Sequence, residues 1–326
     1  MKYDCEPLTY VVPPEEDGLT LRTVLRDKMG VSRKLLSRLK RTERGITVNG
    51  ERRWMSDRLR PGDRVQVRMP AERSDDILPQ PIPLDILYED DHLLVVNKPA
   101  GLIVHPTVGH YINTLANAVV HYWQQKGRAY RFRPVHRLDR DTSGVLAIAK
   151  NAYVHQRLSE QLQTGRVRKT YVAYVHGHPS SPAGTIDAPI DRDPERPHIR
   201  IVTASGYPSV THYETEREYG AAARVRLRPE SGRTHQIRVH MKHIGHPLIG
   251  DEMYGPDSPT ETERRLDALA GRQALHAAAL GFDHPVTGRP VWFEAPLPDD
   301  LLRLERALES MHGFGSSPEV TDFPNI

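Results

Sequence analysis

A proline-rich segment divides the 326-residue chain into a short basic part and a long part of mixed composition. The stretch PAERSDDILPQPIP, which begins at Pro70, holds four prolines and has no apolar periodicity. Such a stretch is typical of a linker. The sequence therefore predicts an N-terminal domain over residues 18–70, a linker over 71–83, a second domain over 84–310 and a mobile tail over 311–326.

The short N-terminal part carries the basic excess of the chain. Residues 18–70 contain fifteen Lys or Arg against five Asp or Glu, a local charge of +10 (15 − 5). The whole chain carries +3 and residues 1–17 sum to −4, so residues 71–326 sum to −3 (+3 − 10 + 4). A basic excess of this kind is either a solvated face or the electrostatic footprint of a domain that binds nucleic acid.

Apolar spacing predicts two short helices and then strands in this basic part. Helical spacing precedes Gly30, and Ser32 is a suitable N-cap for a second helix in RKLLSRLKR. ITVNGERRW predicts a hairpin that turns at Asn49-Gly50, and RVQVRM predicts a strand. Basic residues surround the apolar stripe of the second helix: Arg33, Lys34, Arg38, Lys40 and Arg41.

Two short helices followed by VNG and LRPGDRV resemble the small RNA-binding domain named after ribosomal protein S-four. In that family the second helix and the loop after it contact RNA phosphates. The resemblance therefore implies RNA binding by the five basic residues of the second helix. A generic basic helical hairpin is the alternative.

The long part mixes strand and helix patterns and predicts an α+β domain. LDILYEDDHLLVVNK, VLAIAK, KTYVAYVHG and ARVRLRP are typical of strands. TLANAVVHYWQQ, NAYVHQRLSEQLQ and DDLLRLERALESM are typical of helices. Short apolar runs, the lack of a secretory pattern at the N-terminus and the single cysteine, Cys5, predict a cytoplasmic protein that does not enter a membrane.

The most unusual stretch of the long part is RPVHRLDRDTSG, residues 133–144, because six of its twelve side chains can carry charge. Asp139 lies between Arg137 and Arg140, and guanidinium groups close to a carboxylate stabilise its anion. An ionised carboxylate suits a nucleophile or a base rather than a general acid. A surface network of ion pairs is the alternative explanation.

Two other chemistries fit the sequence poorly. Four histidines lie in THQIRVHMKHIGH, but their spacing of five, three and three does not match a zinc motif and no cysteine assists them. Ser143 lacks the Gly-x-Ser-x-Gly turn of a serine hydrolase. We therefore expect neither a metal site nor a serine nucleophile.

HRLDRDTSG resembles the signature of the RluA family of RNA pseudouridine synthases, and other motifs agree in order. NKPAGLIVHP (97–106), RKTYVAYVHG (168–177) and ESGRTHQIRVHMKHIGHPLIGD (230–251) are similar to further motifs of that family. The resemblance covers about residues 84–295. It implies a catalytic domain with a mixed, largely antiparallel sheet, beside the small S-four-like domain.

The resemblance also implies roles for individual residues. Asp139 takes the place of the essential aspartate, Tyr171 that of the tyrosine that stacks on the target base, and Arg238 that of the arginine that pairs with the aspartate. Arg137 takes the place of an arginine that fills the space of the flipped-out uridine, and Ile237 is expected to contact the base. His136 and Arg140 are expected to hold the loop or to touch phosphate.

The implied reaction breaks the bond between uracil and ribose and rejoins the ring through carbon 5, without a cofactor or an obligate protein partner. Asp139 acts at the anomeric carbon through a covalent acylal, or assists formation of a glycal. The expected substrate is large-subunit ribosomal RNA, with transfer RNA as the alternative. A third possibility is an RNA-binding ribosome-assembly factor whose activity is incidental. A base-releasing glycosidase would need a second carboxylate as acid, for which Asp141 is the candidate.

Overall fold

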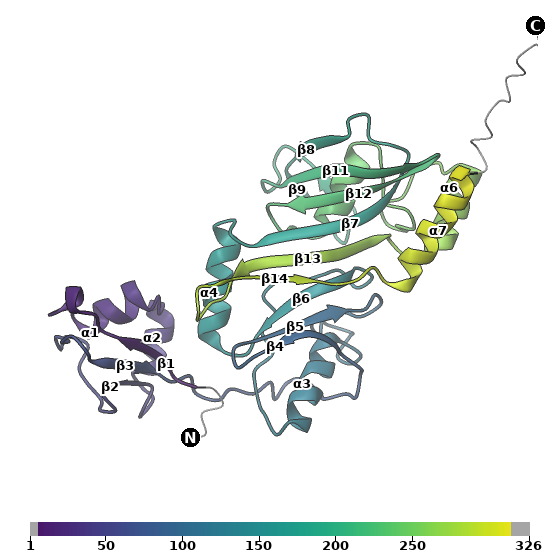
Figure 1. Ribbon diagram of the computed structural model, residues 1–326. Coiled ribbons are helices and arrows are strands. Elements are labelled where there is room, and N and C mark those ends of the chain that lie inside the picture. The colour runs from purple at the N-terminus through teal and green to yellow at the C-terminus, as the bar shows by residue number, and fades with distance from the viewer. Residues whose placement is uncertain (1–5, 314–326) are drawn as a thin grey trace, which may run out of the picture.

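The computed structural model describes residues 6–313 and consists of a small N-terminal domain beside a large C-terminal domain (Figure 1). The small domain comprises a three-stranded antiparallel sheet in the order β1-β3-β2 and short helical turns. Its elements are β1 (Leu8–Val11), η1 (Pro14–Glu16), α1 (Leu21–Thr23), η2 (Val24–Lys28), α2 (Arg33–Leu39), β2 (Ile46–Val48) and β3 (Arg64–Val67).

Two features of the small domain differ from the sequence expectations. Strand β1 precedes residue 18, where the sequence placed the start of the domain, and pairs with β3 along its whole length. The expected turn at Asn49-Gly50 is confirmed, since both residues have positive φ and Val48 bridges Glu51. The residues directly after this turn form only the single Val48–Glu51 bridge, and β2 pairs instead with β3 further along the chain.

The large domain contains a nine-stranded mixed sheet, which matches the α+β expectation. Its order is β4-β5-β6-β13-β7-β12-β11-β8, with β14 paired to β13. All these pairs are antiparallel except β6 with β13. The strands are β4 (Asp85–Glu89), β5 (Leu93–Lys98), β6 (Ser143–Ala149), β7 (Arg168–His176), β8 (Ala183–Asp187), β11 (Val210–Tyr219), β12 (Ala222–Pro229), β13 (Leu275–Asp283) and β14 (Pro290–Glu294).

Helices cover both faces of this sheet (Figure 1). The runs LLVV in β5 and VLAIA in β6 are apolar without alternation because α3 packs on one face and α4 on the other. The helices are α3 (Leu115–Gln125), α4 (Ala152–Gln163), α5 (Gln236–His243), α6 (Glu261–Ala270) and α7 (Asp299–Gly313). A two-stranded sheet of β9 (Ile190–Arg192) and β10 (Arg200–Val202) lies near α5.

The small domain packs against α4 of the large domain. Tyr153 donates a hydrogen bond to the carbonyl of Met29 at 2.7 Å, and Gln156 donates to the carbonyl of Gly30 at 2.8 Å. The backbone N–H of Ser32 in turn donates to Gln156 Oε1 at 3.1 Å. These bonds fix the segment that leads into α2, so the basic helix has a defined place relative to the sheet.

Helix α7 runs to Gly313 and therefore passes residue 310, where the sequence placed the end of the catalytic domain. The rest of the expected tail, from residue 314, lies outside the described residues, as does Cys5. Across residues 6–313 the helices are all too short or too polar to span a lipid bilayer.

Candidate active site

The charged loop over residues 133–144 leads into β6, and side chains from other segments hold it by hydrogen bonds to its backbone carbonyls. Lys98, at the end of β5, is completely buried, and its ammonium group donates to the carbonyls of Pro99, Leu102 and Arg140 at 2.8, 2.8 and 2.9 Å. Arg272 donates to the carbonyl of Asp141 at 2.8 Å from the opposite direction. Because the side chains of Lys98 and Arg272 hold adjacent carbonyls, the path of the loop is fixed at these two residues.

Gly144 allows this loop to enter the sheet. Its φ of +116° is unfavourable for a residue with a side chain, and a Cβ atom would lie 2.1 Å from the carbonyl oxygen of Ala277. The contact arises where β6 runs parallel to β13. Ser143 beside it bonds to His276 at 2.9 Å, but both side chains are buried and the other ring nitrogen of His276 meets the carbonyl of Ala295 rather than a carboxylate, so the pair contributes to packing.

Asp139 lies at the centre of the site and faces Arg238 of α5. Arg238 Nη1 donates to Asp139 Oδ2 at 3.2 Å, and the aspartate side chain remains 27% exposed. Arg238 is itself held by a second carboxylate, since its Nε and Nη2 donate to the two oxygens of Asp251 at 2.6 and 2.7 Å. The fully buried Asp251 is thus the closer partner, and Asp139 keeps one side open to solvent.

The charge of Arg238 is secured by these neighbours. Burial opposes it, but the hydrogen bonds and charges of Asp251 and Asp139 outweigh burial and raise the pKa of Arg238. The ring of Tyr254 lies 4.9 Å from the guanidinium carbon, and its hydroxyl bonds to His235 at 2.8 Å. Arg238 is therefore a cation near neutral pH, and its hydrogen bonds hold it in a fixed position.

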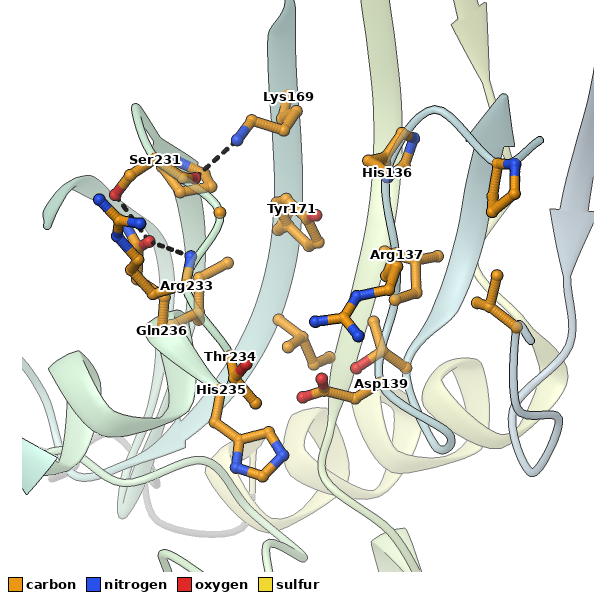
Figure 2. Close-up of a pocket in the computed structure, with 18 of the residues that line it drawn as sticks. His136, Arg137, Asp139, Lys169, Tyr171, Ser231, Arg233, Thr234, His235 and Gln236 are labelled. Carbon is orange, nitrogen blue, oxygen red and sulfur yellow. Dashed lines mark hydrogen bonds between the residues drawn. The ribbon is translucent and has the colours of Figure 1, made fainter. Parts of the chain in front are cut away.

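A cavity of about 830 Å³ opens above Asp139. Figure 2 shows His136, Arg137 and Asp139 on one wall, with Lys169 and Tyr171 of β7 and the 231–236 segment facing them. Ile237 is buried and also lines the cavity. The structure therefore brings together Asp139, Tyr171 and Arg238, which are separated by up to 99 residues in the sequence.

Burial sets the protonation of several groups around this cavity. Burial and the charge of Asp139 raise the pKa of Tyr171, so its phenol stays neutral. Burial, together with the charge of Lys169, lowers the pKa of His136 to about 4, so its imidazole is neutral near pH 7. Burial also lowers the pKa of Lys169 to about 8, and this residue donates to the carbonyl of Ser231 at 2.6 Å.

The other expected site residues occupy more exposed positions. Arg137 is exposed and points into the cavity (Figure 2). Arg140 turns away and pairs with Asp141 at 3.0 Å. The expected RNA-binding residues lie on α2 and just after it, and all but the half-buried Lys40 are exposed: Arg33, Lys34, Arg38, Lys40 and Arg41.

Sequence reasoning missed four residues that hold the site. Lys98 and Arg272 support the loop, and Asp251 holds Arg238. Gln236 is a further support, because its amide oxygen accepts from Ser231 Oγ and the Arg233 N–H while its Nε2 donates to Val210. Lys98 and Asp251 lie within the quoted motifs NKPAGLIVHP and HPLIGD, which was the available signal.

The histidines of THQIRVHMKHIGH do not converge. His240 bonds to Thr211 and to the carbonyl of Ala188, both at 2.9 Å, and His246 contacts the carbonyl of His176 at 3.1 Å. Within residues 6–313, no three His, Cys, Asp or Glu side chains lie close enough together to hold a metal ion. This finding concerns the side chains alone, so the expectation that the reaction needs no metal stays a prediction.

Comparison with known proteins agrees with this geometry. Residues 92–243 match the RNA pseudouridylate synthase family, and residues 8–65 match the family described as the RluD ribosomal pseudouridine synthase N-terminal domain. The uncharacterized RNA pseudouridine synthase YlyB of Bacillus subtilis (strain 168) is 46% identical over 79% of this chain and 84% of its own length.

Two further relatives extend the comparison. The ribosomal large subunit pseudouridine synthase D of Xanthomonas campestris is 44% identical over 80% of each chain. The solved structure of human RNA Pseudouridylate Synthase Domain Containing 1 aligns with a TM-score of 0.54 at 28% identity, over 70% of this chain and 95% of its own. The chain belongs to the RNA pseudouridine synthase family and is therefore an isomerase.

Proposed function

We propose that this enzyme isomerises specific uridines of large-subunit ribosomal RNA to pseudouridine. The main support is a carboxylate, Asp139, that is held beside a buried arginine and opens into a cavity walled by Tyr171. The ribosomal target is supported by relatives named large-subunit synthases and by the basic N-terminal domain. A ribosomal RNA substrate would place the enzyme in the cytoplasm.

The target uridine must leave its stack before Asp139 can reach the sugar. Extruding a base costs a few kcal/mol. Tyr171 offers a stacking surface, typically about 1–3 kcal/mol per base, and its neutral phenol adds no charge near the carboxylate. Arg137 is exposed at the mouth of the cavity, where it would fill the gap that the base leaves in the RNA. Buried Ile237 would contact the ring edge.

The electrostatics of the site suit a carboxylate that acts as an anion. Arg238 donates two short hydrogen bonds to Asp251, which balances most of the positive charge of the guanidinium group. Asp139 receives one longer hydrogen bond from the same group. Asp139 is thus oriented without being fully neutralised. It would act at the anomeric carbon through an acylal or as the base that forms a glycal.

The bonds balance in either case. In the acylal route, a carboxylate oxygen of Asp139 bonds to C1′ of ribose as the bond from N1 of uracil breaks, and this ester bond breaks again when C5 of the rotated ring bonds to C1′. In the glycal route, Asp139 takes the proton from C2′ as the N1–C1′ bond breaks and returns it as the C5–C1′ bond forms. The proton on C5 is then lost and N1 gains one, so no oxidant or group donor is required. The buried side chain of Lys98 would keep the loop of Asp139 in place during the rotation of the ring, through its hydrogen bond to the carbonyl of Arg140.

The proposal is tested with Asp139→Asn, which keeps the side-chain size and removes the charge. We expect release of tritium from RNA labelled at carbon 5 of uridine to vanish, while RNA affinity stays within a few-fold of wild type. Residual turnover within tenfold of wild type would refute the role of Asp139. Chemical mapping of pseudouridine in total RNA, with and without the gene, then identifies the target. A site that disappears from transfer RNA instead would overturn the ribosomal assignment.

A further inference from the structure

Two arginines share one carboxylate, with a third arginine nearby, where the small domain meets the segment that leads to the loop of Asp139. Arg38 of α2 and Arg133 both pair with Glu72 of the linker, one guanidinium on each carboxylate oxygen. Arg131 lies close enough to Arg38 for their charges to repel. The set Arg38, Glu72, Arg131 and Arg133, here called the junction cluster, has a net charge of +2 (3 − 1).

The junction cluster is partly enclosed on the side of Arg133 and Glu72, whereas Arg38 and Arg131 are exposed. The side chains of Arg133 and Glu72 are 12% and 21% exposed, whereas that of Arg38 is 42% exposed. Burial and the charge of Arg38 lower the pKa of Arg133 to about 10, which is the direction expected when cations lack sufficient counter-charge. Within the described part of the chain, Glu72 is the one carboxylate that pairs with Arg38 and Arg133.

The backbone around the cluster is well defined. The hydroxyl of Ser74 accepts a hydrogen bond from the N–H of Phe132 at 2.8 Å, which holds the linker against residues 131–133. Arg133 also donates to the carbonyl of Arg131 at 3.2 Å. The guanidinium groups are therefore presented from fixed segments of both domains, and Glu72 comes from the linker between them.

We infer that the junction cluster binds a backbone phosphate of the substrate RNA and that Glu72 occupies the site when RNA is absent. Guanidinium groups bind phosphate in the same two-pronged manner as they bind carboxylate, so a phosphate can replace Glu72. Arg133 lies six residues before Asp139, and Arg38 lies on the basic helix. An RNA that contacts both domains would cross between them at this point.

This inference rests on the proposed action on RNA and adds a phosphate site at the domain junction. It predicts that two substitutions change the affinity for RNA in opposite directions. The RNA is large-subunit ribosomal RNA transcribed in vitro without modifications. Glu72→Gln removes the competing anion, so we expect binding about three- to tenfold tighter and a salt slope steeper by about 0.7–0.9. Arg131→Gln should weaken binding by roughly the same factor and flatten the slope.

Glu43→Gln is the matched control, because Glu43 is an exposed carboxylate of the small domain and the substitution changes the net charge equally. Glu72→Gln must exceed this control in both affinity and salt slope. Weaker binding by Glu72→Gln at an unchanged melting temperature would show that Glu72 is a structural bridge and would overturn the phosphate site. If Glu72→Gln does not fold, Arg131→Gln alone decides, since unchanged affinity there refutes the inference. Turnover of the same proteins reports separately on the proposed function.

Discussion

Asp251 provides the sharpest test of how the site is held, because it touches Arg238 and not the cavity. In Asp251→Asn the carboxylate is replaced by an amide, so one of the two bonds to Arg238 at 2.6 and 2.7 Å becomes a contact between two donors. Breaking a buried ion pair costs about 3–5 kcal/mol, and the remaining amide oxygen places this change near the lower end.

The catalytic effect should follow from a shift of Arg238. Displacing a positioning group by about 1 Å can cost up to about a hundredfold in rate. We therefore expect kcat to fall about 10- to 100-fold, equivalent to about 1.4–2.8 kcal/mol, with little change in KM. The assay is tritium release at saturating RNA, with urea unfolding of the same protein.

Glu305→Gln is the control for a general loss of stability. Glu305 accepts hydrogen bonds from Tyr219 and Arg224 at 2.8 and 2.9 Å, on the part of the sheet that α7 covers, and it does not line the cavity. This variant should lose stability and keep kcat. A stable Asp251→Asn enzyme with kcat within threefold of wild type would refute the positioning role of Asp251.

Four further predictions can be checked with the same assays. Gly144→Ala should destabilise the fold by more than about 3 kcal/mol, because its Cβ would strike the Ala277 carbonyl, whereas Gly62→Ala, with φ +88° but open space, should cost less in thermal unfolding. Lys169 has a pKa lowered to about 8 against 10.5 unfolded, so between about pH 8 and 10 the unfolded chain binds more protons and stability should rise with pH; Lys169→Met should flatten this rise in urea titrations at several pH values. Deleting residues 1–70 should weaken RNA binding and flatten its salt dependence, and an unchanged slope would contradict RNA binding by this domain. Excess EDTA should leave the rate on a short RNA unchanged, and a loss restored by zinc or manganese would contradict a reaction without metal.

Features of the fold could be predicted from the sequence where the residues that determine them are close together along the chain. Apolar periodicity is a property of ten to fifteen neighbouring residues, so α3, α4, β6 and β7 could be assigned from sequence before any contact was known. The motif HRLDRDTSG likewise lies within one loop, and it pointed to Asp139 directly. Strand β1 was missed because its partner, β3, lies more than fifty residues away.

The sequence by itself determined the kinds of residue in the site, the order of its motifs and the basic character of the N-terminal domain. Only the tertiary structure decided that Asp251 is the closer partner of Arg238, that Lys98 holds the carbonyl of Arg140, and that Glu72 joins Arg38 to Arg133. The physical reason is that a guanidinium or ammonium group binds whichever acceptor the folded backbone brings within about 3 Å. With 42 acidic residues in the chain, that choice depends on packing between distant segments and not on spacing along the sequence.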